Sequence, residues 1–152
     1  MQDWNRIEDV LDFAISEEEE AAIFYTEMAK KASTEWMKEA FKGFAKEEQG
    51  HKAKLESIKS GGKIPESVNK KVLDLKIGDY LIDVKPSADM DHQEALILAM
   101  KKEKAAFKLY SDLAQIIHEE DIKQVFLMLA QEEAKHKLRF EIQYDDEYLK
   151  EN

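Results

Sequence analysis

Six ionisable residues of this chain form two sets of three with the same spacing. The sets, 85 residues apart, are Glu18, Glu48 and His51, and Glu103, Glu133 and His136. A glutamate and a histidine at positions i and i+3 of a helix share one face, so both can reach the same ion. Four carboxylates in one core would repel one another, and two divalent cations would neutralise them. The two sets therefore predict a site for two metal ions.

The ligand types indicate which metals such a site would hold. Oxygen-rich coordination with one imidazole per ion suits iron or manganese, and fits zinc or copper less well. We therefore expect two iron (Fe) ions, with manganese (Mn) as the alternative and zinc (Zn) as an ion that a purified sample could contain. The chain has no cysteine, which excludes disulfides, thiolate metal sites and iron–sulfur centres.

The six residues belong to a longer internal repeat. Residues 11–58 recur at 96–143 with a constant offset of 85 and no gap. Each of the six occupies a position that the helical periodicity otherwise gives to Leu, Phe, Ala or Ile. The competing interpretation is a helix face rich in Glu and His that is exposed to water. Recurrence on apolar faces favours burial, where a metal would offset the cost of the buried charges. Five other glutamates lie off these faces, and we expect them to be solvated: Glu17, Glu19, Glu20, Glu47 and Glu132.

The apolar spacing predicts four helices of about 28 residues each, joined in pairs by short turns. Ser33 or Thr34 can cap the second helix, and Gly61 with Gly62 can end it. We predict an all-α four-helix bundle, built from two repeated helical hairpins that are joined by a long crossover.

The whole chain, residues 1–152, is expected to form a single domain. We place the first hairpin at about 3–60, the crossover at about 61–88 and the second hairpin at about 89–149. The crossover is too apolar for a free linker, so we expect it to pack along the bundle and to contain a short helical turn. Asp91 and Glu94 have the spacing of a capping box at the start of the third helix.

Composition and charge exclude several classes of protein. The net charge of −10 argues against nucleic-acid binding, which needs clustered Lys and Arg. The apolar runs are too short to span a membrane, and the N-terminus lacks the features of a signal peptide. We therefore expect a cytoplasmic protein that binds neither nucleic acid nor membranes.

Two tyrosines also recur in the repeat, each seven residues after the first glutamate of its set. Tyr25 and Tyr110 therefore lie two turns along the same helix face. They could be core residues with satisfied hydroxyls. They could also have a catalytic role, by donating a hydrogen bond to a ligand carboxylate. The two roles do not exclude each other.

The motifs resemble those of the rubrerythrin-like branch of the ferritin-like di-iron carboxylate superfamily. The segments that carry the resemblance are 14–18 with 24–25, 45–51, 103–110 and 130–136. This resemblance implies a ferritin-like four-helix bundle whose two irons react with dioxygen or hydrogen peroxide, and it implies homodimers or larger homo-oligomers. Glu48 and Glu133 would bridge or chelate the irons, and the other two glutamates would be terminal ligands. Each histidine would bind one iron.

The chain departs from this branch in two respects. Rubrerythrins proper usually have a further ligand glutamate three residues after the first glutamate of the second half, where this chain has Ala106. They also carry a cysteine-rich rubredoxin module, whereas this chain has no cysteine. Electrons would therefore come from a separate electron-donor protein. Ferritins proper match less well, because they have one Glu-x-x-His motif and this chain has two.

Three functions are compatible with these observations. The leading one is a di-iron oxidoreductase of the peroxidase or ferroxidase type, which would reduce hydrogen peroxide or dioxygen. The second is iron binding or storage of the ferritin type, which would require a large hollow assembly. The third is a helical bundle whose metal has a purely structural role.

Overall fold

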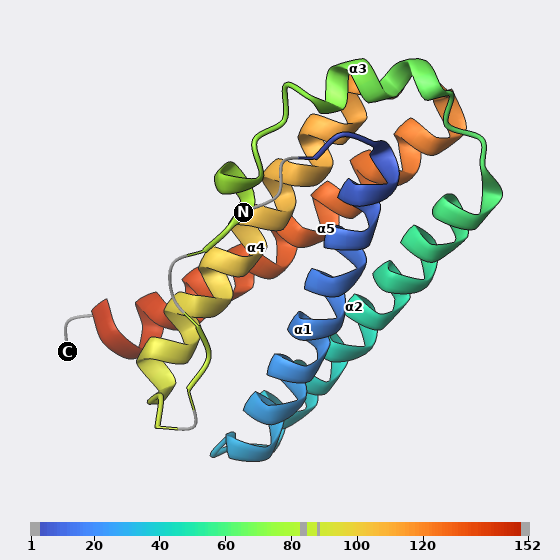
Figure 1. Ribbon diagram of the computed structural model, residues 1–152. Coiled ribbons are helices and arrows are strands. Elements are labelled where there is room, and N and C mark those ends of the chain that lie inside the picture. Colours follow the sequence, from blue (N-terminus) through green and yellow to red (C-terminus); the bar gives the residue numbers. More distant parts are fainter. Residues whose placement is uncertain (1–3, 83–84, 88, 150–152) are drawn as a thin grey trace. The chain divides into compact units, whose positions relative to one another are not determined.

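Four long helices make up most of the chain in the computed structural model, which describes residues 4–82, 85–87 and 89–149 (Figure 1). They are α1 (Ile7–Lys31), α2 (Glu35–Gly61), α4 (His92–Ile116) and α5 (Glu120–Tyr144). The short helical segments are η1 (Glu66–Val68), α3 (Asn69–Val72), η2 (Ile77–Tyr80) and η3 (Asp145–Leu149). The described residues contain no strand, and the all-α, ferritin-like fold class predicted from the sequence is confirmed.

The internal repeat is visible in the helix boundaries. The first residues of α1 and α4 are 7 and 92, and their last residues are 31 and 116, so both pairs differ by 85. The first residues of α2 and α5, 35 and 120, differ by the same amount. The observed helices of 25 to 27 residues are slightly shorter than expected. The duplicated sequence therefore folds into two hairpins of matching construction.

The chain divides into two compact units at residues 76 and 77. The first unit contains α1, α2, η1 and α3, and the second contains η2, α4, α5 and η3. The predicted start of the first hairpin at residue 3 lies outside the described residues, as do residues 83–84 and 88 of the predicted crossover. The organisation as a single domain stays a prediction.

In the first unit, α1 packs along α2 as a hairpin (Figure 1). The turn between them ends where the Thr34 hydroxyl accepts a hydrogen bond from the backbone N–H of Met37 at 3.3 Å, which satisfies one of the first amides of α2. At the other end, Gly62 adopts a φ of 62°, a left-handed conformation that glycine tolerates without strain. Both predicted boundaries of α2 are confirmed.

The first half of the crossover packs onto the same hairpin. Val68 and Val72 are buried. The backbone N–H of Ile7, at the start of α1, donates to the side-chain oxygen of Asn69 at 2.9 Å. The expected helical turn is therefore present as η1 and α3, and α3 lies against α1, to which this hydrogen bond attaches it.

In the second unit, α4 packs along α5, and η2 lies against α4. Asp91 accepts from the backbone N–H of Glu94 at 2.8 Å, and the Glu94 carboxylate accepts from the N–H of Asp91 at 3.4 Å, which confirms the capping box. The buried Tyr80 of η2 donates its hydroxyl to Asp112 at 2.7 Å. Lys108 donates to the same carboxylate at 3.0 Å. The second half of the crossover is thus attached to α4.

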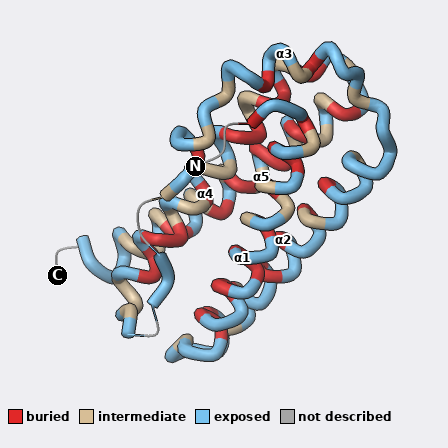
Figure 2. The backbone as a smooth tube through the Cα atoms, viewed as in Figure 1, coloured by how far each residue is buried: buried red, intermediate tan, exposed pale blue. Residues whose placement is uncertain are grey.

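Buried positions recur along each of the four long helices (Figure 2). They are mostly apolar, and their spacing of three and four residues is the periodicity that the sequence displays. Among the described residues, none of the helices combines the length and the hydrophobicity that crossing a lipid bilayer requires.

Candidate metal centre

The first hairpin brings together the first predicted set of three residues. Glu18 lies on α1, and Glu48 and His51 lie one turn apart on α2. The Nδ1 atom of His51 is 3.6 Å from Oε2 of Glu18 and 3.7 Å from Oε1 of Glu48. One ligand atom of each residue lies within 4.8 Å of the other two. Three donor atoms from two helices therefore converge on one point.

The second hairpin repeats this arrangement. Glu103 lies on α4, and Glu133 and His136 lie on α5. The Nδ1 atom of His136 is 3.6 Å from Oε1 of Glu103, the same distance as in the first hairpin. Again, one ligand atom of each residue lies within 4.8 Å of the other two. We call the two sets the first and the second triad.

All six triad side chains are buried. Their exposed fractions lie between 1% and 4%. Apart from the buried tyrosines and Trp4, they are the only polar or charged side chains among the buried residues that the structure describes. The burial expected from the sequence is confirmed, and the alternative of a solvated face rich in Glu and His is wrong. Ion-pair formation inside one triad cannot balance its charge, because two carboxylates outnumber one imidazole even if that imidazole is protonated.

The donor atoms fit a divalent metal. Carboxylate oxygens and an imidazole nitrogen are ligands for iron and manganese, and a cation would neutralise the excess negative charge of each buried triad. The spacing of the donors is compatible with one small ion per triad, which the residues would approach from two helices. The binding of metal by the six residues stays a prediction.

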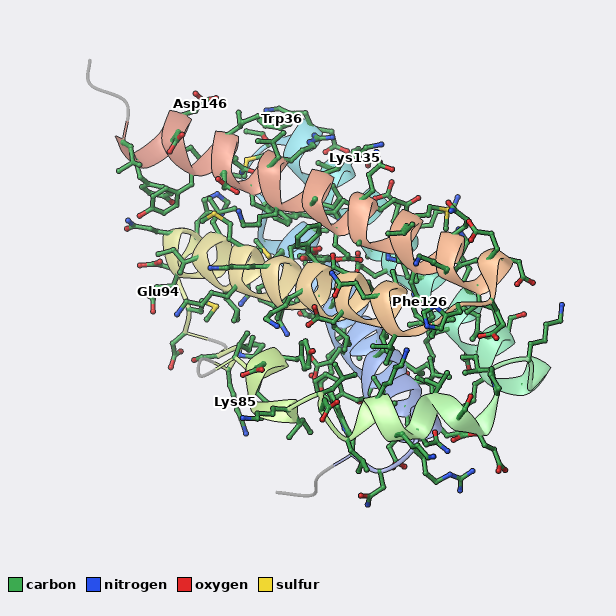
Figure 3. The ribbon with its side chains drawn as sticks, turned by 90° about the horizontal axis from the view of Figure 1, so that it is seen from above. Trp36, Lys85, Glu94, Phe126, Lys135 and Asp146 are labelled. Carbon is green, nitrogen blue, oxygen red and sulfur yellow. The ribbon has the colours of Figure 1, made fainter. Side chains whose placement is uncertain are left out.

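The repeated tyrosines lie in the core of their hairpins. Tyr25 and Tyr110 are 0% and 1% exposed. The Tyr25 ring lies 6.0 Å from that of Phe44 between ring centroids, and the Tyr110 ring stacks at 6.2 Å on that of Phe126, which is labelled in Figure 3. These contacts support the packing role that was predicted. The proposed hydrogen bonds to ligand carboxylates stay a prediction.

The glutamates beside the triads are far more accessible to solvent. Glu19, Glu20 and Glu47 are exposed, as expected, and Glu19 accepts a hydrogen bond from Lys52 at 3.3 Å. Glu17 and Glu132 are only partly exposed. On α1 and α2, an exposed glutamate lies one residue from the buried one: Glu19 beside Glu18, and Glu47 beside Glu48. This contrast supplies matched control positions for the triad residues.

A comparison with known proteins identifies one family. The family described as Rubrerythrin matches residues 9–83 and 94–152, which together cover most of the chain and include all six triad residues. No curated protein and no solved structure shows a significant match.

Proposed function

We propose that this chain, which belongs to the Rubrerythrin family of ferritin-like di-iron carboxylate proteins, is an oxidoreductase whose two irons react with hydrogen peroxide or dioxygen. The observation that carries the proposal is the pair of buried triads, which have the same residue types on equivalent helices. A fold that needed only stability would gain more from apolar residues at these six positions.

The six triad residues would hold the metal. Each hairpin would contribute two carboxylates and one imidazole, so that four negative charges meet the four positive charges of two divalent ions. With iron bound, the centre would supply the redox chemistry that reduces the oxidant. We propose that the two triads contribute to one centre, as the family membership implies, with Glu48 and Glu133 as the residues that could contact both ions.

The residues next to the triads would keep bulk water away. In the first hairpin, Phe44 and Leu55 lie one turn from Glu48 and His51 on the same helix, and both are buried. Tyr25 and Tyr110 are the polar groups that we propose to orient the ligand carboxylates through hydrogen bonds. If so, replacing either tyrosine with Phe would slow oxidation of the bound iron and would leave the number of bound irons unchanged.

The electrons for peroxide or dioxygen reduction would come from a separate protein. The chain contains no cysteine, so it holds no rubredoxin-type centre of its own. The net charge of −10 favours an electron donor that carries a positively charged contact surface.

Anaerobic stopped-flow mixing tests the proposed reaction. The protein loaded with two Fe²⁺ ions is mixed with hydrogen peroxide or with dioxygen, and ferric absorption is followed. We expect oxidation faster than that of Fe²⁺ in the same buffer without protein, and a Glu47→Gln variant that behaves like the wild type. A Glu48→Gln variant should lose the rapid phase. Oxidation no faster than that of unbound Fe²⁺ would contradict the proposal.

The same preparation separates the two competing functions. Iron storage predicts uptake well beyond two irons per chain and a large hollow assembly, which light scattering would detect. A structural metal predicts that bound iron raises the melting temperature, while peroxide and dioxygen oxidise it no faster than unbound Fe²⁺.

A further inference from the structure

The exposed side of α4 carries a row of lysines. Lys101, Lys104 and Lys108 are exposed and follow one another at intervals of three and four residues, so they share one side of the helix. Two apolar side chains lie beside the row: Ile97, one turn before Lys101, is 37% exposed, and Phe107 is 43% exposed. We call these five residues the α4 face.

The lysines of the α4 face lie on the opposite side of the helix from the second triad. The buried side of α4 contains Glu103 of that triad. At about 100° per residue, the three lysines are rotated from the centre of the buried side by about 150–170°. An α-helix with its side chains is about 10–12 Å across. The α4 face is therefore separated from Glu103 by about one helix diameter.

The internal repeat shows that this positive charge is specific to α4. Residues 95–111 contain four lysines and a single acidic residue, the buried Glu103. The equivalent residues of α1, 10–26, contain five acidic residues and neither Lys nor Arg. Lys104, for example, occupies the position of Glu19. Because the two hairpins match in construction, the fold of a hairpin does not require lysines at these positions.

The ion pairs between the helices of each hairpin differ in the same way. In the first hairpin, Lys52 of α2 donates to Glu19 of α1 at 3.3 Å. The equivalent residues of the second hairpin are Lys137 and Lys104, two cations that cannot form an ion pair with each other. Lys137 instead donates to Glu141 on its own helix. The second hairpin therefore leaves Lys104 without the ion pair that its counterpart makes, and an anionic partner would supply one.

The charge of the α4 face is opposite to the charge of the whole chain. The net charge of −10 governs the field at long range, where a positively charged donor surface is favoured. At physiological ionic strength, charges are screened over about 8 Å, so a docked partner responds mainly to the side chains that it touches. Asp112, which accepts a hydrogen bond from Lys108 at 3.0 Å, neutralises only one of the three lysines. The α4 face therefore attracts an acidic surface.

We propose that the α4 face is the docking surface for the electron-donor protein, and that the donor meets it with an acidic surface. This inference rests on the proposed function, which requires a separate donor. The three lysines would pair with carboxylates of the donor, and Ile97 and Phe107 would supply apolar contacts. From residue 97 to residue 108 the helix rises about 17 Å. A face of this length suits electron-transfer complexes, which bury less than about 1,200 Å² in total.

Docking at the α4 face would bring the donor close to the second triad. Electron transfer between proteins slows steeply with distance, and a single helix separates the lysines from Glu103. Phe107 lies one turn after Glu103 and is exposed, whereas its repeat equivalent, Ala22, is buried. Each encounter would transfer one electron from the donor, so two encounters would return two ferric ions to the ferrous state.

Binding of a plant-type ferredoxin, an acidic redox protein, tests the docking surface without metal in the triads. The metal-free, ¹⁵N-labelled full-length protein is titrated with the ferredoxin at low salt, and amide chemical shifts are followed. We expect the largest shifts at residues 97–108. A variant that combines Lys101→Ser with Lys104→Glu introduces the residues of α1 and should bind about tenfold more weakly, because it loses the charge attraction. Both lysines are exposed, so its helical circular dichroism should match that of the wild type.

The matched control combines Lys42→Ser with Lys46→Glu. Both lysines are exposed on α2, and the net charge changes by the same amount as in the α4 variant. The control should bind the ferredoxin like the wild type. No binding of the ferredoxin by the wild type would overturn the proposal, and so would equal weakening in the two variants. Tighter binding of cytochrome c, a basic redox protein, would overturn it too.

Reduction kinetics extend the test to the iron-loaded protein. After oxidation of the bound iron, reduced ferredoxin should reduce the α4 variant about tenfold more slowly than the control, whereas dithionite, which needs no docking surface, should reduce both at the same rate. An α4 variant that ferredoxin reduces as fast as the control would overturn the proposal. Because binding is measured without metal, its failure is distinct from a failure of rapid iron oxidation, which would contradict the proposed function.

Discussion

Replacing one triad carboxylate by its amide should have opposite effects on stability with and without metal. Glu48→Gln keeps the shape of the side chain and removes its charge. In the metal-free protein, a carboxylate oxygen of Glu48 lies within 4.8 Å of one of Glu18, and both side chains are buried. We expect the metal-free variant to be more stable than the metal-free wild type, because the substitution removes this repulsion.

The magnitude follows from the distance. Two negative charges no more than 4.8 Å apart repel by at least about 3 kcal/mol at an effective dielectric constant of about 20. An imperfectly hydrogen-bonded amide costs about 1 kcal/mol, so the net gain is about 2 kcal/mol. For a chain of this size, that gain raises the melting temperature by about 4–8 °C. In the presence of metal the order reverses, because a metal at a hundred times its dissociation constant stabilises the wild type by about 2.7 kcal/mol.

Differential scanning calorimetry in EDTA and in excess Mn²⁺ measures both effects on the same protein. The control is Glu47→Gln, at the exposed neighbouring glutamate of α2, which should change the free energy of unfolding by less than about 0.5 kcal/mol in either condition. A metal-free Glu48→Gln variant less stable than the wild type would contradict the expected release of charge repulsion. Equal stabilisation of both proteins by Mn²⁺ would refute it as well.

Two further predictions concern the crossover. Burial and the hydrogen bond to Asp112 raise the pKa of the Tyr80 hydroxyl above its ordinary value. As the pH rises, the unfolded chain therefore loses the hydroxyl proton before the folded protein does. The stabilisation that this proton gives the folded protein is fully present below about pH 10 and is lost as the pH rises further. Tyr80→Phe should lower the free energy of unfolding by about 1 kcal/mol at pH 7 and should reduce its further decrease at alkaline pH. Urea unfolding at pH 7 and pH 11 measures both effects. A variant whose free energy of unfolding falls between these pH values as much as that of the wild type would contradict this role of Tyr80. Gly62→Ala should lower the free energy of unfolding by about 1 kcal/mol, because φ is 62° there, whereas Gly61→Ala, where an added Cβ meets no atom within 4 Å, should cause no loss in the same urea assay.

The helices and the two triads were predictable because their signals are local and periodic. Thr34 and Gly62 mark helix ends through the chemistry of one turn, independent of the rest of the chain. Glu18 and Glu103 stood out because each interrupts an apolar face, and a charged residue in such a position needs a compensating partner. The internal repeat shows the same pattern of buried charged residues in both halves of the chain, which strengthened the prediction.

Other features depend on pairings that periodicity does not encode. The hydrogen bond between Tyr80 and Asp112 joins residues 32 positions apart on different elements, and neither residue type indicates the other in the sequence. The exposure of Leu138, on a helix whose buried face is also apolar, likewise became evident only in the structure. An alternation of apolar residues alone does not say which of them a fold covers.

We propose that the two triads together bind two metal ions in one centre. Anaerobic titration with Fe²⁺, followed by oxidation and Mössbauer spectroscopy, tests it most directly. We predict two Fe²⁺ ions per chain, a spin-coupled ferric pair after oxidation, and loss of the pair in a variant that combines Glu48→Gln with Glu133→Gln. Binding of fewer than two ions, two ions without spin coupling, or a coupled pair that survives in the double variant would contradict the claim.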